Sequence, residues 1–156
     1  DVSRRAPDSL DQAGLAAEKT LFVRIQDGST TEPFWIMLYA HKVSGEKKYL
    51  DSARRCADLL LSLQRPGGGW GDQWSFNGTA SGNTGVYHGI SFNDRATNAP
   101  YCILLMMHHL TGEKKYIANL GKLWPWILKA NLGENDQVAG WVDQYNDDGT
   151  PARARR

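Results

Sequence analysis

The chain has 156 residues, of which 41% are hydrophobic, and its 18 basic and 17 acidic residues give a formal net charge of +1. These values are typical of a globular protein and exclude a disordered or fibrous chain. The balanced charge gives no general basic field for nucleic acid or a membrane surface, and no apolar run reaches the ~20 residues of a membrane span. We therefore expect one domain over residues 1–156, with no nucleic acid and no membrane among its partners.

Helical periodicity runs along most of the chain. An amphipathic stretch around Leu10 to Ile25 predicts a first helix, and two pairs of helices follow it. Pro33 and Pro100 suit the first turn of a helix, because the missing N–H group has no partner there. The four later helices are expected at Pro33 to Val43, Lys47 to Leu63, Pro100 to Leu110 and Lys114 to Ala130.

Three segments of the chain occur twice, which indicates an internal duplication. Two of them return 67 residues later and the third returns 71 residues later. The pairs are Asp27-Gly-Ser-Thr-Thr-Glu-Pro33 with Asp94-Arg-Ala-Thr-Asn-Ala-Pro100, Ser44-Gly-Glu-Lys-Lys-Tyr49 with Thr111-Gly-Glu-Lys-Lys-Tyr116, and Trp70-Gly-Asp-Gln-Trp74 with Trp141-Val-Asp-Gln-Tyr145. The repeat units predicted from these pairs span about residues 27–93 and 94–156.

Repeated α-hairpins of this kind predict an all-α fold that forms part of an α/α toroid. Five helices do not close such a ring, so we expect an incomplete barrel that is truncated at its C-terminus. A second chain or a missing C-terminal part would then complete the toroid. The hairpin ends of a toroid gather on one face, where the long Gly-rich loops and both Asp-x-x-Thr turns would line a cleft.

Two groups of residues in these loops are candidates for a binding site. Trp70, Trp74, Trp141 and Tyr145 are candidate platforms for sugar rings, while Asp143 and Gln144 are retained in both copies of their loop. Asp94 either caps the helix that follows it or binds calcium or a sugar. Calcium prefers several oxygen ligands, which Asn93, Asn146 and Asp147 could add to that carboxylate.

Several motifs resemble the pectate lyases of polysaccharide lyase family ten, over roughly Asp27 to Arg156. They are the two Gly-Glu-Lys-Lys-Tyr segments, Gln64-Arg-Pro-Gly-Gly-Gly-Trp70, Ile90-Ser-Phe-Asn-Asp-Arg-Ala-Thr97, and Gly140-Trp-Val-Asp-Gln-Tyr145 followed by Pro151-Ala-Arg-Ala-Arg155. The resemblance implies an α/α toroid, a secreted or periplasmic location, and calcium-dependent cleavage of polygalacturonate, an acidic polysaccharide, by β-elimination with an arginine base.

The resemblance also assigns residues to this site. It places Asp94 at a calcium-ligand position, beside Asn146 and Asp147, and makes Arg95 and Arg155 candidate substrate-binding residues. Asn146 stands where the family usually has Asp, and neither Arg153 nor Arg155 matches the family's base. The catalytic residues therefore stay unassigned, and we expect weak or no lyase activity from residues 1–156 alone.

Two other interpretations remain open at this stage. A non-catalytic glycan-binding or assembly subunit on the same scaffold is favoured by Asn146 and by the unassigned base. Terpene cyclases share the α/α architecture and a Gln-x-x-x-Gly-x-Trp pattern, which Gln64, Gly68 and Trp70 fit, but the chain has no Asp-x-Asp-Asp motif. Cys56 and Cys102 lie on predicted amphipathic helices, where free cysteines are usually buried.

Overall fold

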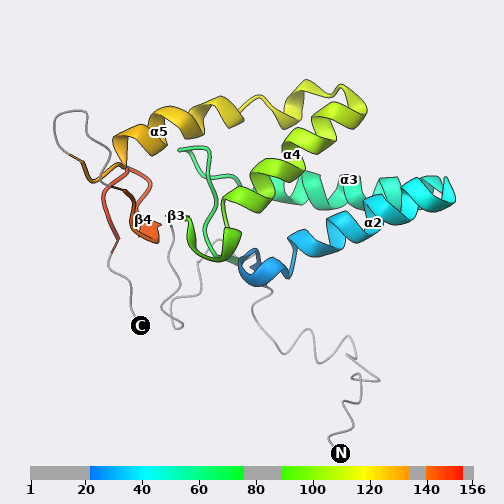
Figure 1. Ribbon diagram of the computed structural model, residues 1–156, viewed down its shortest axis with the longest axis horizontal. Helices are drawn as coiled ribbons and strands as arrows, with labels where there is room; N and C mark the ends of the chain where they lie inside the picture. Colours follow the sequence, from blue (N-terminus) through cyan, green and yellow to red (C-terminus); the bar gives the residue numbers. More distant parts are fainter. Residues whose placement is uncertain (1–21, 76–88, 134–139, 153–156) are drawn as a thin grey trace, which may run out of the picture.

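The computed structural model describes residues 22–75, 89–133 and 140–152, and these are mostly helical, which confirms the all-α fold class (Figure 1). The α-helices are α2 (Thr31–Ser44), α3 (Lys47–Ser62), α4 (Asn98–Thr111) and α5 (Leu123–Lys129). Short 3-10 helices are η1 (Gln26–Gly28), η2 (Asn93–Arg95), η3 (Lys114–Tyr116) and η4 (Leu120–Lys122). Two antiparallel strand pairs join β1 (Phe22–Arg24) to β2 (Gln73–Ser75) and β3 (Ile90–Ser91) to β4 (Gln144–Tyr145).

The helices α2, α3 and α4 lie where the sequence predicts them, but the expected helix over Lys114 to Ala130 is wrong. That span is divided into η3, η4 and α5. A continuous helix would place the ring of Pro125 against the carbonyl group of Gly121, four residues earlier, and would lack one hydrogen bond. The chain instead restarts at Leu123, so that Pro125 lies in the first turn of α5.

The expected helix around Leu10 to Ile25 is also wrong at its end, because Phe22–Arg24 forms strand β1. Its residues up to 21 lie outside the described part of the chain. Thr30 and Thr97 directly precede α2 and α4, but their side chains do not cap these helices. Their hydroxyl groups donate to carbonyl oxygens instead, at 2.6 Å to Arg24 and 3.1 Å to Trp70.

The core lies between the helical hairpins in two clusters. The larger cluster joins β1, α2, α3 and α4, and the smaller one joins β3, α5 and β4. Gly68 sits between the two copies with φ +89°, and a Cβ atom there would lie 2.7 Å from the backbone nitrogen of Leu123. The glycine run before Trp70 is therefore explained by the close approach of this loop to α5.

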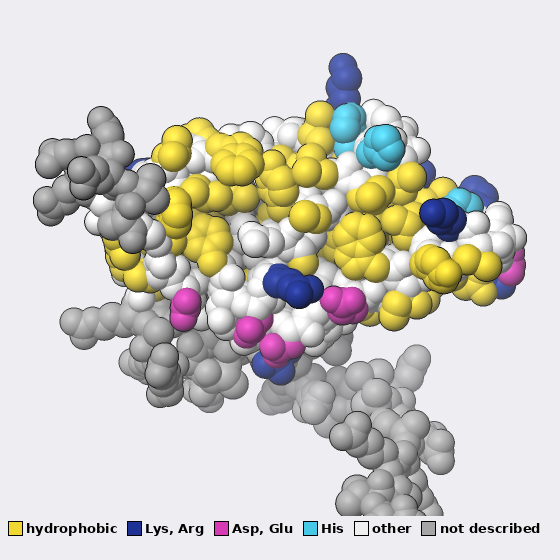
Figure 2. All heavy atoms as spheres, viewed as in Figure 1, with side chains coloured by type: hydrophobic (Ala, Val, Ile, Leu, Met, Phe, Trp, Pro, Cys, Tyr) yellow, Lys and Arg dark blue, Asp and Glu magenta, His cyan; other side chains and the backbone are white. Residues whose placement is uncertain are grey.

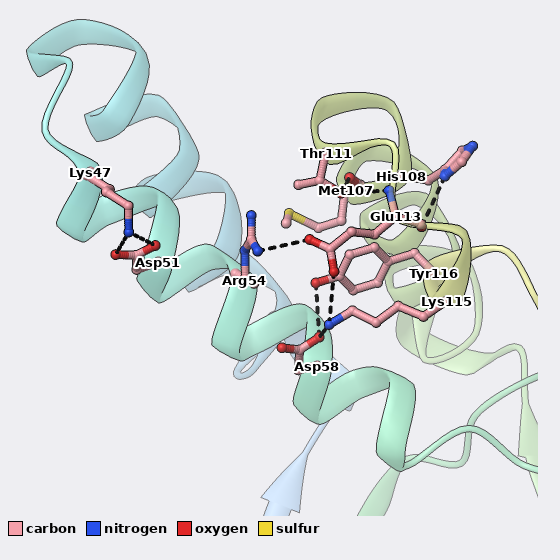
Figure 3. A network of polar contacts seen from close by, with 10 residues as sticks. All are labelled: Lys47, Asp51, Arg54, Asp58, Met107, His108, Thr111, Glu113, Lys115 and Tyr116. Atoms are coloured by element: carbon pink, nitrogen blue, oxygen red, sulfur yellow. Dashed lines mark hydrogen bonds and ion pairs between the residues drawn. The ribbon is translucent and has the colours of Figure 1, made fainter.

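A polar network on the surface connects α3 with η3 (Figure 3). The Tyr116 hydroxyl donates to Asp58 at 2.9 Å, and Lys115 contacts the same carboxylate at 2.8 Å. Arg54 pairs with Glu113 at 2.9 Å. These contacts tie the first copy to the second, although exposed ion pairs contribute only about 0–1 kcal/mol each.

Hydrophobic side chains remain exposed over α2, α4 and α5 (Figure 2). On α2 the exposed fractions are 61% for Ile36, 69% for Tyr39 and 70% for Val43. A largely apolar groove of about 770 Å³ lies between α2 and α4, next to Tyr39 and Leu110. In the described residues, every helix is too short or too polar to span a membrane.

Candidate functional site

The loops with the Asp-Gln motif form the same backbone contact in both copies. The N–H group of Ile25 donates to the carbonyl oxygen of Asp72 at 2.9 Å, and that of Phe92 donates to Asp143 at 2.8 Å. Each contact places an Asp-Gln loop beside the 3-10 turn of its own copy. The turns η1 and η2 also contact each other. Candidate residues from both copies therefore meet in one region.

Asp94 occupies the turn η2 and does not cap α4. Its Oδ2 atom accepts a hydrogen bond of 2.7 Å from the side-chain amide of Gln26 and another of 2.7 Å from that of Asn93. Gln26 belongs to the first copy, so this carboxylate joins the two turns. Gln26 was not among the residues predicted from the sequence, although the repeat pairs it with Asn93 and both are amides directly before an aspartate.

Arg95 has a backbone conformation that arginine rarely adopts. Its φ angle is +63°, after +44° at Asp94. The first copy has the same pair of positive angles, +59° at Asp27 and +77° at Gly28, so glycine fills the position that Arg95 fills in the second copy. Because a left-handed conformation costs a non-glycine residue about 1–2 kcal/mol, the fold alone favours glycine here.

The side chain of Arg95 is exposed and lines a small pocket of about 220 Å³ between the two turns. The carboxylates of Asp27, Glu32 and Asp94 line the same pocket. Asp27 forms an ion pair with Arg24 at 3.1 Å. No contact in the described residues engages the Arg95 guanidinium, which is therefore available for an anionic group.

Trp70 and Tyr145 are completely buried, so their positions are explained by packing. The indole N–H group of Trp70 donates to the carbonyl oxygen of Leu60 at 2.7 Å. The hydroxyl group of Tyr145 accepts from the N–H group of Val142 at 2.8 Å. Neither ring offers a face to a sugar. The side chains of two further candidates, Trp74 and the substrate-binding candidate Arg155, lie outside the described part.

Trp141 makes the same contact as Trp70 but stays 42% exposed. Its indole N–H group donates to Ile127 at 2.9 Å, and Ile127 is the repeat partner of Leu60. The second copy covers Trp70, whereas no described residue covers Trp141 to the same extent. Trp141 and the exposed Asp143 line a shallow, mainly apolar pocket of about 340 Å³.

Asp72 and Gln144 form a contact between the two copies. Asp72 is only 3% exposed, and its Oδ2 atom accepts from the side-chain amide of Gln144 at 2.8 Å. Gln144 was predicted to bind substrate, but this amide is directed toward Asp72. Burial raises the pKa of Asp72, whereas the nearby Ser91 hydroxyl and the hydrogen bond from Gln144 lower it.

The three residues predicted to bind calcium have separate partners. Asp147 forms a two-atom ion pair with Arg65, and Asn146 donates to the Thr150 hydroxyl at 2.9 Å within a turn. Asp94 accepts the two amide hydrogen bonds described above. Across residues 22–75, 89–133 and 140–152, no three His, Cys, Asp or Glu residues are grouped to hold a metal ion. Since calcium takes 6–8 oxygen ligands, the described side chains do not fit a calcium site formed by protein alone.

Comparison with known proteins identifies the family. The sequence model of the pectic acid lyase family matches residues 8–156, nearly the whole chain. Searches of curated proteins and of solved structures gave no match. The match extends over both copies of the repeat and over both turns of the candidate site, so the chain belongs to the pectic acid lyase family.

Proposed function

We propose that this chain binds polygalacturonate between its two turns and takes part in its cleavage by β-elimination. Family membership supports an acidic polysaccharide as substrate. The observation that carries the proposal is Arg95, whose guanidinium is contacted by no described residue and whose backbone is left-handed where the first copy has glycine. Strain of this kind at a non-glycine residue occurs mainly at functional sites.

A uronate carboxylate is a suitable partner for Arg95. Its two oxygen atoms match the planar guanidinium, which can donate two parallel hydrogen bonds to them. In β-elimination, a base removes the ring proton α to this carboxylate, a double bond forms in the ring, and the glycosidic oxygen leaves. Arg95 would stabilise the negative charge that develops toward the carboxylate during this step. We assign no catalytic base among the described residues.

Sugar rings flanking the bound uronate would lie toward Trp141 and Asp143. The exposed indole of Trp141 offers an apolar face, and the carboxylate of Asp143 can accept hydrogen bonds from sugar hydroxyl groups. In the first copy, the equivalent ring of Trp70 is buried and serves packing. Substitution of Trp141 tests whether its ring contacts the sugar.

Calcium dependence is a separate part of the proposal. Pectate lyases are generally calcium-dependent, and Asp94 is the described carboxylate that we propose as a ligand. Because the described side chains do not fit a calcium site by themselves, we derive no step through the metal. Oligogalacturonate binding measured with calcium and with a chelator, in the wild type and in Asp94→Ala, tests this part. Equal affinities in all four measurements would remove calcium from the proposal.

The function is tested in two measurements on the chain mixed with polygalacturonate. Binding of the polymer is measured by titration, and cleavage is followed through the ultraviolet absorbance of the unsaturated product. Fully methyl-esterified polygalacturonate is the matched control, because it has the same sugar chain without the carboxylates. We expect binding of the acidic polymer and much weaker binding of the ester. Equal binding of both polymers would refute recognition of the carboxylate by Arg95.

A non-catalytic glycan-binding protein is the second candidate. It is favoured because Asn146 replaces an acid expected from the family, and because Asp147, the next carboxylate, already pairs with Arg65. The same assay separates the two candidates. Binding of polygalacturonate without any unsaturated product would support the non-catalytic protein, whereas product that is lost in Asp94→Ala would support the lyase.

A further inference from the structure

The segment from Trp70 to Asp72 bonds to the chain at two equivalent places of the repeat, in β3 and directly after β1. The carbonyl oxygen of Trp70 accepts from the N–H group of Ser91 at 2.8 Å, and that of Asp72 accepts from Ile25 at 2.9 Å and Gln26 at 3.2 Å. The side chain of Asp72 then reaches the second copy. Asp72 therefore occupies a buried junction between the copies.

Within the described part of the chain, two buried oxygen atoms at this junction have no hydrogen-bond partner. They are Oδ1 of Asp72 and Oε1 of Gln144, and they belong to the two side chains already joined by the 2.8 Å hydrogen bond to Oδ2. When Asp72 is ionised, both atoms can accept hydrogen bonds but neither can donate one. A buried acceptor without a partner is unfavourable, because it has lost its hydrogen bonds to water.

One proton on Asp72 would satisfy both atoms. A protonated carboxyl group has an O–H donor, and a primary amide has a donor and an acceptor on adjacent atoms. An acid and an amide can therefore form a closed pair with two hydrogen bonds. The first of these, from Gln144 to Asp72, is present at 2.8 Å.

We propose that Asp72 is held as a neutral carboxylic acid whose Oδ1–H group donates to Oε1 of Gln144. This pair is a clamp between the two copies, and it holds the loop that carries Asp143 and Gln144 against the first copy. Asp72 is thus a positioning residue that acts through Gln144. The consequence for substrate binding rests on the proposed function, but the clamp itself does not.

The surroundings of Asp72 favour the neutral acid. Burial is the largest effect and raises its pKa above the usual 3.8, and the negative charges of Asp94 and Asp27 raise it further. Asp27 is partly neutralised by its ion pair with Arg24. The nearby Ser91 hydroxyl and the Gln144 amide lower the pKa of Asp72, since both stabilise the ionised form.

The clamp predicts the sign of a pH dependence. Because the pKa of Asp72 is raised in the folded state, the folded chain keeps this proton at pH values where the unfolded chain has lost it. The stabilisation is complete below the unfolded pKa and is lost as the pH rises through the folded pKa. The contribution of Asp72 to the free energy of unfolding should therefore decrease as the pH rises above about 4. Other titrating groups add their own pH dependence to it.

The test uses Asp72→Asn, which replaces the acid with an amide of the same shape. Asparagine can form both hydrogen bonds with Gln144 at any pH, so the variant should fold and should be at least as stable as the wild type near neutral pH. The decrease in the urea unfolding midpoint that Asp72 causes as the pH rises should be absent in this variant. Asp143→Asn makes the same change at the exposed counterpart and should keep the wild-type pH dependence.

A second measurement observes the proton directly. Carbon-13 NMR of the aspartate carboxyl groups should contain one signal that is missing in Asp72→Asn and titrates above 3.8 in the wild type. A titration at or below this value would overturn the clamp. So would an Asp72→Asn variant with the wild-type pH dependence. Strong stabilisation of the wild type, but not of Asp72→Asn, by added calcium would also overturn it, because the carboxylate would then be needed as an anion.

Discussion

Replacement of Arg95 by glycine should make the chain more stable while weakening its binding of polygalacturonate. The first copy has glycine at this position, so the substitution introduces a residue that the same turn already accepts. Most point substitutions either lower stability or leave it nearly unchanged. Opposite effects on stability and binding would therefore indicate that Arg95 is kept for its side chain.

The magnitude follows from the backbone. The φ angle of +63° costs arginine about 1–2 kcal/mol, which glycine does not lose. Glycine also destabilises the folded chain by about 0.4–1 kcal/mol, because it increases the conformational entropy of the unfolded chain. With no described contact to lose, the net gain is about 0.5–1 kcal/mol, or an increase of about 2 °C in melting temperature. Loss of hydrogen bonds to a carboxylate should weaken binding at least about tenfold.

Thermal unfolding and titration with oligogalacturonate measure the two effects on the same samples. Gly28→Ala is the matched control in the first copy, where a Cβ atom would lie 2.6 Å from Cγ of Glu32 at a φ angle of +77°. This control should lower the melting temperature. If Arg95→Gly destabilises the chain, the left-handed strain is not the dominant effect. If it binds oligogalacturonate as the wild type does, Arg95 does not contact the substrate.

Three other substitutions or reagents test the packing and the site. Gly89→Ala should destabilise the chain by at least about 2 kcal/mol in urea unfolding, because its Cβ atom would lie 1.7 Å from the carbonyl oxygen of Tyr145. Near-wild-type stability would show that β3 and β4 can separate. Cys102 is exposed and should react with a thiol reagent at about pH 8. Burial raises the pKa of Cys56 to about 11 and should protect it from the reagent until the chain unfolds. Equal reaction rates of the two thiols would contradict this burial. Trp141→Ala should weaken oligogalacturonate binding about tenfold, from the loss of about 1.5 kcal/mol of apolar contact; an unchanged affinity would leave the ring a packing role only.

The sequence predicted the helices where local signals agree with tertiary packing. Prolines in the first turn and glycines at the ends bound α2 and α4 in both the sequence and the structure. The helix over Lys114 to Ala130 was predicted from the spacing of apolar residues alone, and Pro125 outweighs that spacing. The paired strands contain two or three residues each, too few for an alternating pattern to indicate them.

The candidate site was predictable by residue type but not by exposure. Trp70 and Trp141 have the same motif and the same indole hydrogen bond, yet one is buried and the other is 42% exposed. That difference arises from what packs on each loop, which a repeat in the sequence does not reveal. Cys102 was likewise expected to be buried, and the structure places it on the exposed side of α4.

The differences between the two copies have two causes, and only one of them points to function. Asp72 and Asp143 are the same residue in the same backbone contact, and their unequal burial follows because the second copy packs on the first. Stacking cannot explain Gly28 and Arg95, since both turns have the same left-handed backbone and glycine suits it better. A sequence difference that opposes the conformational preference of a shared backbone needs another reason, and the exposed guanidinium between two acidic turns provides one. For this reason Arg95, rather than the exposed Trp141, is the residue on which the proposed recognition of a uronate depends.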